Sequence, residues 1–149
     1  MTWWRRLSRL PAGDRLFSLV LGRIAPYSGT IGARVLELRP GYARVQLRDR
    51  RRVRNHLHSI HAIALINLGE VATGLAVLST LSPGMRGIVT RIESDYLKKA
   101  RGKLLAEAEF DIPGKINENE PCRVEAALKD ASGETVCRVR ASWLLGYKA

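Results

Sequence analysis

The stretch that decides the fold is residues 59–80, SIHAIALINLGEVATGLAVLST, in which Glu70 is the only formally charged side chain. Ser59 is a residue type that caps helices, so the stretch predicts a helix from there to about Thr80. The apolar residues fall on nearly every side of this helix, and a helix of that kind is buried. We therefore expect one long helix at the centre of the molecule.

Both flanks of this helix carry patterns typical of β-strands. On its N-terminal side, apolar residues from Ile31 to Leu47 follow a period of two, and Pro40-Gly41 interrupts them as a hairpin turn would. The C-terminal flank contains strand-like segments at about 86–98, 103–112, 122–129 and 135–145. Short turns join these segments, so we expect an α+β fold in which an antiparallel sheet of five to six strands wraps around the central helix.

An amphipathic segment precedes the strands. Leu10, Phe17, Leu21 and their apolar neighbours follow helical spacing, which predicts a helix from about Asp14 to Ile24 that Pro26 stops. The basic aromatic tip Trp3-Trp4-Arg5-Arg6 can dock on an anionic membrane or pack on the domain, and we favour packing. A chain of 149 residues without a linker or repeat predicts one domain, 1–149, with the amphipathic helix within 1–25 and the core at 26–149.

Composition and charge exclude several classes of protein. A content of 46% hydrophobic and 26% charged residues excludes disordered, collagen-like and disulfide-framework chains. The net charge of +11 favours an anionic partner, but no RNA-recognition, KH or helix-turn-helix signature accompanies it, so we do not expect nucleic acid. Two isolated cysteines, with no signal peptide and no membrane span, predict a cytoplasmic protein.

Within the central stretch, the presence of the charged residue Glu70 most needs an explanation. An unpaired carboxylate in so apolar a segment costs several kcal/mol, so Glu70 is either neutralised by one of the 25 basic residues or functional. Gly69 and Gly74 each weaken the helix by about 1 kcal/mol relative to Ala, which predicts the close approach of another backbone. A polar stripe follows one helix face, at Asn67, Glu70, Thr73 and Gly74.

All three histidines lie just ahead of the helix or at its start, in the run RNHLHSIH at 54–61. His56 and His58 have the positions of loop or capping residues. His61 falls in the first turn of the helix, where unpaired N–H groups and the positive end of the helix dipole can hold an oxyanion or a polarised carbonyl. No third ligand follows at conventional spacing, so we expect no metal site.

Two motifs of the chain resemble a known family. The run Asn55-(five residues)-His61-(eight residues)-Glu70 resembles the active-site segment of the hotdog-fold acyl-coenzyme A thioesterases of the phenylacetate-pathway type. Residues 96–102, YLKKARG, are similar to that family's strand ending in Tyr-x-x-Pro-Ala-x-x-Gly. The resemblance covers Tyr27 to Phe110 and is closer still to an uncharacterised bacterial branch. It implies a hotdog fold and hydrolysis of acyl thioesters, without a metal or any cofactor other than the coenzyme A of the substrate.

The resemblance also implies a role for each matching residue. Ala62 stands where the family has a Gly, and it keeps the backbone N–H that polarises the thioester carbonyl. Asn55 and His61 would order the loop and hold substrate or water, while Glu70 would act as general base or nucleophile. The candidate substrate contacts are Asn67, Thr73, Thr90 and Arg101, together with the basic residues Arg50, Arg51 and Arg52 for the phosphates of coenzyme A.

Alternatives to these roles remain open. The basic run can be a solvated face, and the same pocket suits a non-catalytic binder of acyl-coenzyme A or lipid. A hotdog dehydratase is a further alternative, although the Phe-Pro-Gly motif of one common branch is missing.

Helix geometry predicts that the protein associates with itself. His61 and Glu70 lie nine residues apart, or roughly 13 Å along a helix axis, so they cannot easily flank one carbonyl from the same helix. We expect a two-fold homodimer, or a dimer of such dimers, in which antiparallel helices bring Ala62 of one chain toward Glu70 of the other. Gly69 and Gly74 would ease the approach of the two helices.

Overall fold

The computed structural model describes residues 2–114 and 116–147. Its helices are α1 (Thr2–Leu7), α2 (Gly13–Ile24), α3 (Pro26–Gly29) and α4 (Ala62–Leu78), with a short 3-10 helix, η1, at Arg51–Val53. Its strands are β1 (Arg34–Arg39), β2 (Tyr42–Leu47), β3 (Met85–Tyr96), β4 (Leu104–Glu109), β5 (Glu120–Lys129) and β6 (Thr135–Tyr147).

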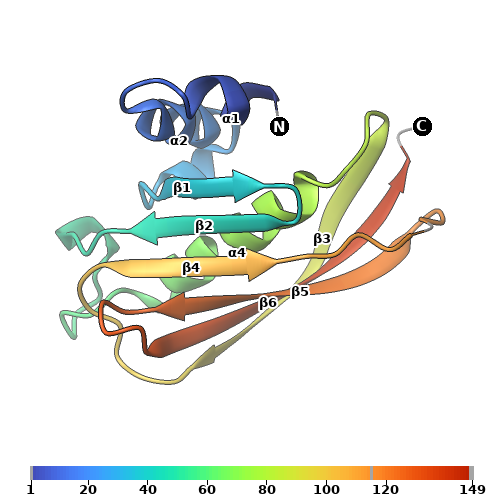
Figure 1. Ribbon diagram of the computed structural model, residues 1–149. Helices are drawn as coiled ribbons and strands as arrows, with labels where there is room; N and C mark the ends of the chain where they lie inside the picture. The colour runs from blue at the N-terminus through green and yellow to red at the C-terminus, as the bar shows by residue number, and fades with distance from the viewer. Residues whose placement is uncertain (1, 115, 148–149) are drawn as a thin grey trace.

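The six strands form one antiparallel sheet in the order β1-β2-β4-β5-β6-β3. Helix α4 lies across one face of this sheet, whereas α1 and α2 sit beside β1 at its edge (Figure 1). The predicted α+β architecture, with an antiparallel sheet around a long central helix, is confirmed. The hairpin also turns where predicted, at Pro40-Gly41, and Gly41 takes a positive φ of 76° there.

The core lies between α4 and the sheet. Leu68, Ala72, Ala76 and Val77 of the helix are fully buried, and the odd-numbered residues of β6 from Val139 to Leu145 face them. The close approach predicted at Gly69 and Gly74 comes from side chains of β6 and not from another backbone. A Cβ atom at Gly69 would lie 2.4 Å from the Cβ of Val139, so only glycine lets the helix settle on the sheet here.

We expect Gly69→Ala to destabilise the protein by about 1–3 kcal/mol, because its methyl group would overlap Val139. This loss outweighs the higher helix propensity of alanine, which is worth about 1 kcal/mol. Gly74→Ala is the matched control, because its new Cβ would lie in ordinary contact, 3.5 Å from the ring of Trp143. Urea denaturation of both variants measures the difference, and equal effects would contradict this packing.

Helix α2 covers the free edge of β1, and α1 packs on α2. The backbone N–H of Val35 donates to the hydroxyl of Ser18 at 2.9 Å, and Arg34 pairs with Asp14. Trp4 is buried against Phe17 in an edge-to-face contact with ring centroids 5.0 Å apart. The tip therefore packs as predicted at Trp4, while the side chain of Trp3 lies outside the described part of the chain.

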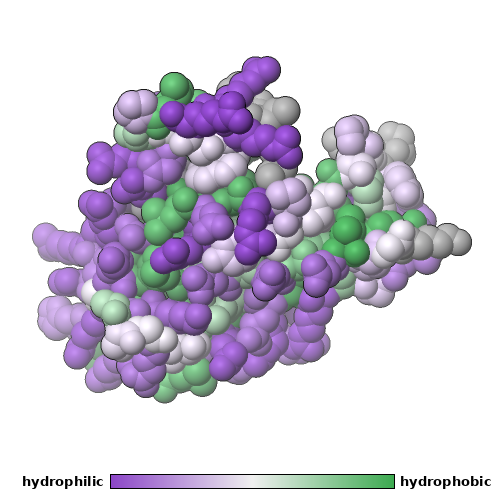
Figure 2. Space-filling view, in the orientation of Figure 1, coloured by the Kyte–Doolittle hydropathy of each residue, from purple (hydrophilic) through white to green (hydrophobic). Residues whose placement is uncertain are grey.

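The surface that faces the viewer in Figure 2 is mostly hydrophilic, notably around the loop that follows β2, with smaller hydrophobic patches between the hydrophilic residues. Within residues 2–114 and 116–147, no helix is long and apolar enough to cross a membrane.

Candidate functional site

Helix α4 begins at Ala62, with His61 as its N-cap. The Nδ1 atom of His61 accepts the backbone N–H of Ile63 at 3.1 Å, which leaves the ring proton of a neutral imidazole on Nε2. The prediction that Ser59 caps the helix is wrong. The isolated bridge between Arg54 and Ile60 keeps the backbone extended past Ser59, so the helix starts three residues later than its sequence signal.

Asn55 shapes the loop ahead of the helix. Its Oδ1 atom accepts the backbone N–H of Leu57 at 2.9 Å and both the N–H and the hydroxyl of Ser59 at 3.2 Å. The tight path takes His58 to a positive φ of 53°, in the left-handed region. The Oδ1 atom of Asn55 thus holds the loop together and positions the start of the helix.

The first turn of α4 presents a free donor at Ala62. No acceptor among the described residues takes its N–H, which lies at the positive end of the helix dipole. The Ala62 carbonyl accepts the hydroxyl of Tyr96, at the end of β3, at 3.4 Å. Sequence reasoning assigned no role to Tyr96, although this residue opens the second family-like motif.

A pocket of about 210 Å³ opens beside this helix start. His61, Asn67 and Arg52 line it together with Tyr27 and Thr30 from the segment before β1. Asn67 is buried; its amide nitrogen donates to the Tyr27 carbonyl at 3.4 Å, but its Oδ1 has no partner within the described chain. A buried acceptor without a donor is costly, so this oxygen marks where a ligand or water would donate a hydrogen bond.

Glu70 follows Asn67 by one helical turn and is half-buried. Burial raises the pKa of its carboxyl group, as expected for a carboxylate leaving water. No ion pair or hydrogen bond to its side chain exists among residues 2–114 and 116–147, so none of the basic residues described there neutralises it. Of the two readings of Glu70, the structure therefore supports an unpaired, perturbed carboxylate.

Glu70 does not line this pocket, and most of the other predicted contacts lie apart from it too. The Thr73 hydroxyl is fully buried and donates to the Glu70 backbone carbonyl at 3.0 Å. The Thr90 hydroxyl donates to the Ser142 carbonyl at 3.2 Å, at a bulge where β3 pairs with β6. Arg51 and Arg101 are exposed and do not line the pocket, whereas Arg52 does. The structure thus groups His61, Asn67 and Arg52.

Solved structures with the same architecture include thioesterases. A probable thioesterase of unknown function from Pseudomonas aeruginosa is 22% identical, with 93% of this chain and 97% of that chain covered and a TM-score of 0.78. A thioesterase from Haemophilus influenzae is 15% identical, with 85% and 88% covered and a TM-score of 0.72. The chain therefore shares the fold of these proteins, the hotdog-type fold that the resemblance implied.

The sequence also matches the model of one protein family. Residues 13–145 match the family described as a domain of unknown function, DUF4442, and the chain belongs to that family. A structural-genomics crystal structure whose name states no function is 30% identical, with 98% of this chain and 96% of that chain covered and a TM-score of 0.81. No curated protein matches the chain.

Proposed function

We propose that this protein hydrolyses thioesters of coenzyme A or related acyl thioesters. The observation that carries the proposal is Glu70, a half-buried carboxylate with a raised pKa and no cation beside it among the described residues. A carboxylate whose pKa is raised by burial is a stronger base than an exposed carboxylate, which suits proton transfer. The thioesterase names of the neighbours from P. aeruginosa and H. influenzae agree with this class of reaction.

In the proposed mechanism, the thioester carbonyl rests against the Ala62 N–H at the positive end of α4. Glu70 takes a proton from water while that water attacks the carbonyl carbon, and the N–H stabilises the oxyanion that forms. The tetrahedral intermediate then expels the thiolate, which recovers the proton from Glu70. The alternative step is direct attack by the Glu70 carboxylate on the carbonyl carbon, which breaks the C–S bond, releases the thiolate to take a proton from solvent and forms an anhydride. Water then cleaves the anhydride and restores the carboxylate.

Four further residues assist in this proposal. Asn55 and His61 hold the loop and the helix start, and the free Oδ1 of Asn67 orients the water or the substrate. Arg52 contacts a phosphate of coenzyme A. Contacts from Thr73, Thr90, Arg50, Arg51 and Arg101 stay predictions.

The proposed active unit is a homodimer, with a dimer of dimers as the larger form. Ala62 and Glu70 are eight residues apart on α4, or about 12 Å along its axis, so two chains are needed to place both at one carbonyl. Ile63 and Leu78 on the helix are each 50% exposed, and Tyr96 on the edge strand β3 is 47% exposed. Gly69 takes no part in this association, because it faces Val139 of its own chain.

A non-catalytic binder of acyl-coenzyme A or lipid is the second candidate. Ala62 favours the non-catalytic binder. Its methyl group adds bulk at the position where the thioesterase family that the sequence resembles has a glycine, which leaves room for the carbonyl. A cytoplasmic location belongs to the proposal in either case. Both Cys122 and Cys137 are free thiols in the structure, as a reducing compartment would keep them.

A hydrolysis screen over acyl-coenzyme A thioesters, from acetyl to long-chain and aromatic acyl groups, tests the proposal. We expect turnover of at least one member, followed by chromatographic release of coenzyme A. A thiol reagent is avoided because the partly exposed Cys122 would react with it. Tight binding without turnover of any member would establish the non-catalytic binder instead, and neither binding nor turnover would contradict both candidates.

A further inference from the structure

A second, larger hollow lies between the N-terminal helices and the β1–β2 hairpin. Its volume is about 770 Å³, within the range of small-molecule sites. It adjoins the pocket at the start of α4, because Thr30 and Arg52 line both. No acidic residue among the described ones lines it, and the arginines that do are Arg15, Arg23, Arg34, Arg48, Arg50 and Arg52.

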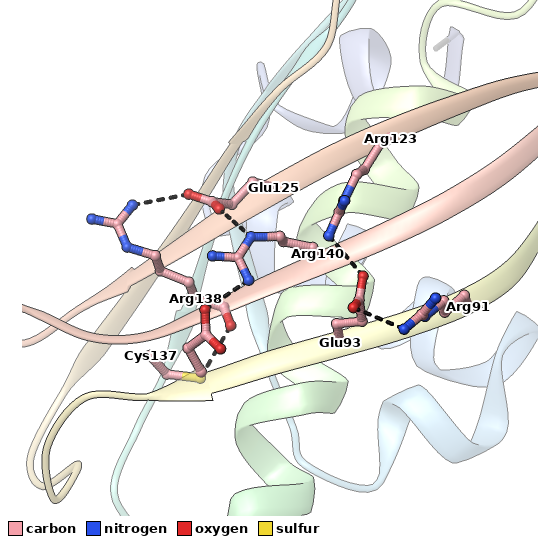
Figure 3. Close-up of polar contacts among 8 residues, drawn as sticks. Arg91, Glu93, Arg123, Glu125, Cys137, Arg138 and Arg140 are labelled. Atoms are coloured by element: carbon pink, nitrogen blue, oxygen red, sulfur yellow. Dashed lines mark hydrogen bonds and ion pairs between the residues drawn. The ribbon is translucent and has the colours of Figure 1, made fainter.

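Most of this positive charge is uncompensated. Within the described residues only Arg34 of the six forms an ion pair, with Asp14. The outer face of the sheet differs, as Figure 3 shows: Glu93 binds both Arg91 and Arg123 there. Glu125 likewise binds Arg138 and Arg140 on that face (Figure 3). Arginines that stay unpaired around one hollow therefore form a distinct feature of this chain.

Two of these arginines converge on one point over Gly32. Gly32 has a positive φ of 61°, and a Cβ atom built there would lie 2.0 Å from Nη2 of Arg52 and 3.4 Å from Nη1 of Arg50. Two guanidinium groups so close together repel each other. An anion bound between them would attract both groups and so replace this repulsion by attraction. The bare backbone at Gly32 leaves the room in which the guanidinium groups meet.

Apolar side chains also line the hollow. Leu19 and Leu21 of α2, Val35 of β1 and Val71 of α4 line it alongside the arginines. Five unpaired guanidinium groups exceed what one carboxylate can neutralise, whereas a phosphate monoester carries about −1.5 to −2 and a diphosphate more. Arginine also matches phosphate oxygens with two parallel hydrogen bonds.

We propose that this hollow binds a phosphorylated amphiphile, with the phosphate held by Arg50 and Arg52 over Gly32 and the apolar part between α2 and Val71. Two sources supply this chemistry, the nucleotide end of a coenzyme A thioester and the head group of an anionic phospholipid. The site does not depend on hydrolysis at Glu70, because its occupancy is a binding equilibrium measured without turnover.

Calorimetric titration of the full chain with three probes tests the site. The probes are adenosine 3′,5′-bisphosphate, dihexanoyl phosphatidic acid below its micellar concentration, and inorganic pyrophosphate, each at low and at physiological salt. We expect Arg52→Ala to weaken binding at least about tenfold, the scale of a lost charge-assisted hydrogen bond. The matched control is Arg91→Ala, which removes the same charge from an exposed arginine of β3 that does not line the hollow, and we expect less than about a twofold effect.

Gly32→Ala provides a second, independent variant, because its methyl group would occupy the place of the Arg52 guanidinium. It too should weaken binding, and thermal melting checks that it stays folded. Preference for the bisphosphate would identify the nucleotide source, and preference for phosphatidic acid the lipid source. The proposal is overturned if no probe binds, or if Arg91→Ala weakens binding as much as Arg52→Ala. Binding in a protein that hydrolyses no thioester would keep this site and remove only the proposed function.

Discussion

Glu70→Gln is expected to lower turnover of the best acyl thioester at least about a hundredfold, the scale of a lost general base or nucleophile. The amide keeps the shape of the side chain but can neither accept the water proton nor attack the carbonyl. Steady-state hydrolysis with chromatographic detection of coenzyme A measures the loss. Glu37→Gln is the matched control, since Glu37 is exposed on β1 and its only ion-pair partner in the described part of the chain is Arg39.

The pH dependence of both activity and stability follows from burial of the same group. Because the pKa of Glu70 is raised in the folded protein, activity should fall as the pH drops through that raised value, above the usual range for glutamate. Burial penalises the ionised form, so Glu70 lowers the stability of the folded state at neutral pH, and Glu70→Gln should raise the melting temperature by a few degrees. This gain in melting temperature should shrink as the pH falls, and it should vanish below the pKa that glutamate has in the unfolded chain.

The turnover and the melting temperature of Glu70→Gln together distinguish a chemical role of Glu70 from a structural one. A variant that is more stable at pH 7 and inactive places Glu70 in the mechanism, at a cost in stability typical of active sites. Undiminished turnover in Glu70→Gln would remove Glu70 from the mechanism altogether. A lower melting temperature at neutral pH would mean that the carboxylate has a partner in solution.

Elements with a strong local pattern could be predicted from the sequence. The apolar run of α4, the alternation in β1 and β2 and the turn at Pro40-Gly41 are local signals, and they lie where the structure has them. Helix α4 begins later than predicted because the bridge between Arg54 and Ile60 overrides the capping preference of Ser59. The capping preference of Ser59 reflects only its neighbours in sequence. The bridge, in contrast, forms only when the loop folds back on itself.

Features that depend on distant segments could not be predicted in this way. The reason for Gly69 lies seventy residues downstream at Val139, and sequence reasoning assigned it to a second helix instead. Arg15 and Arg23 join Arg50 and Arg52 around one hollow only because α2 lies against the edge of β1. The unpartnered Oδ1 of Asn67 is likewise a property of packing, although the polar stripe did indicate the residue.

Mixed dimers of Asn55→Ala and Glu70→Gln are expected to recover activity that each variant alone has lost. Asn55→Ala removes the acceptor of three hydrogen bonds that shape the loop before α4, so it disables the half of the site that contains the Ala62 N–H. Glu70→Gln disables the half that contains the base. If each active site combines the helix start of one chain with Glu70 of its partner, a mixed dimer has one intact site and one doubly damaged site.

Co-refolding equal amounts of the two variants makes half of the dimers mixed, so the mixture should reach about a quarter of wild-type activity. Each variant refolded alone is the control and should stay inactive. Subunit exchange is demonstrated separately by tagging one variant and recovering the other with it. Exchange without any recovered activity would show that each site is built within a single chain. The 12 Å that separate Ala62 from Glu70 along α4 would then have to be spanned by the substrate itself, with its carbonyl near one residue and its water near the other.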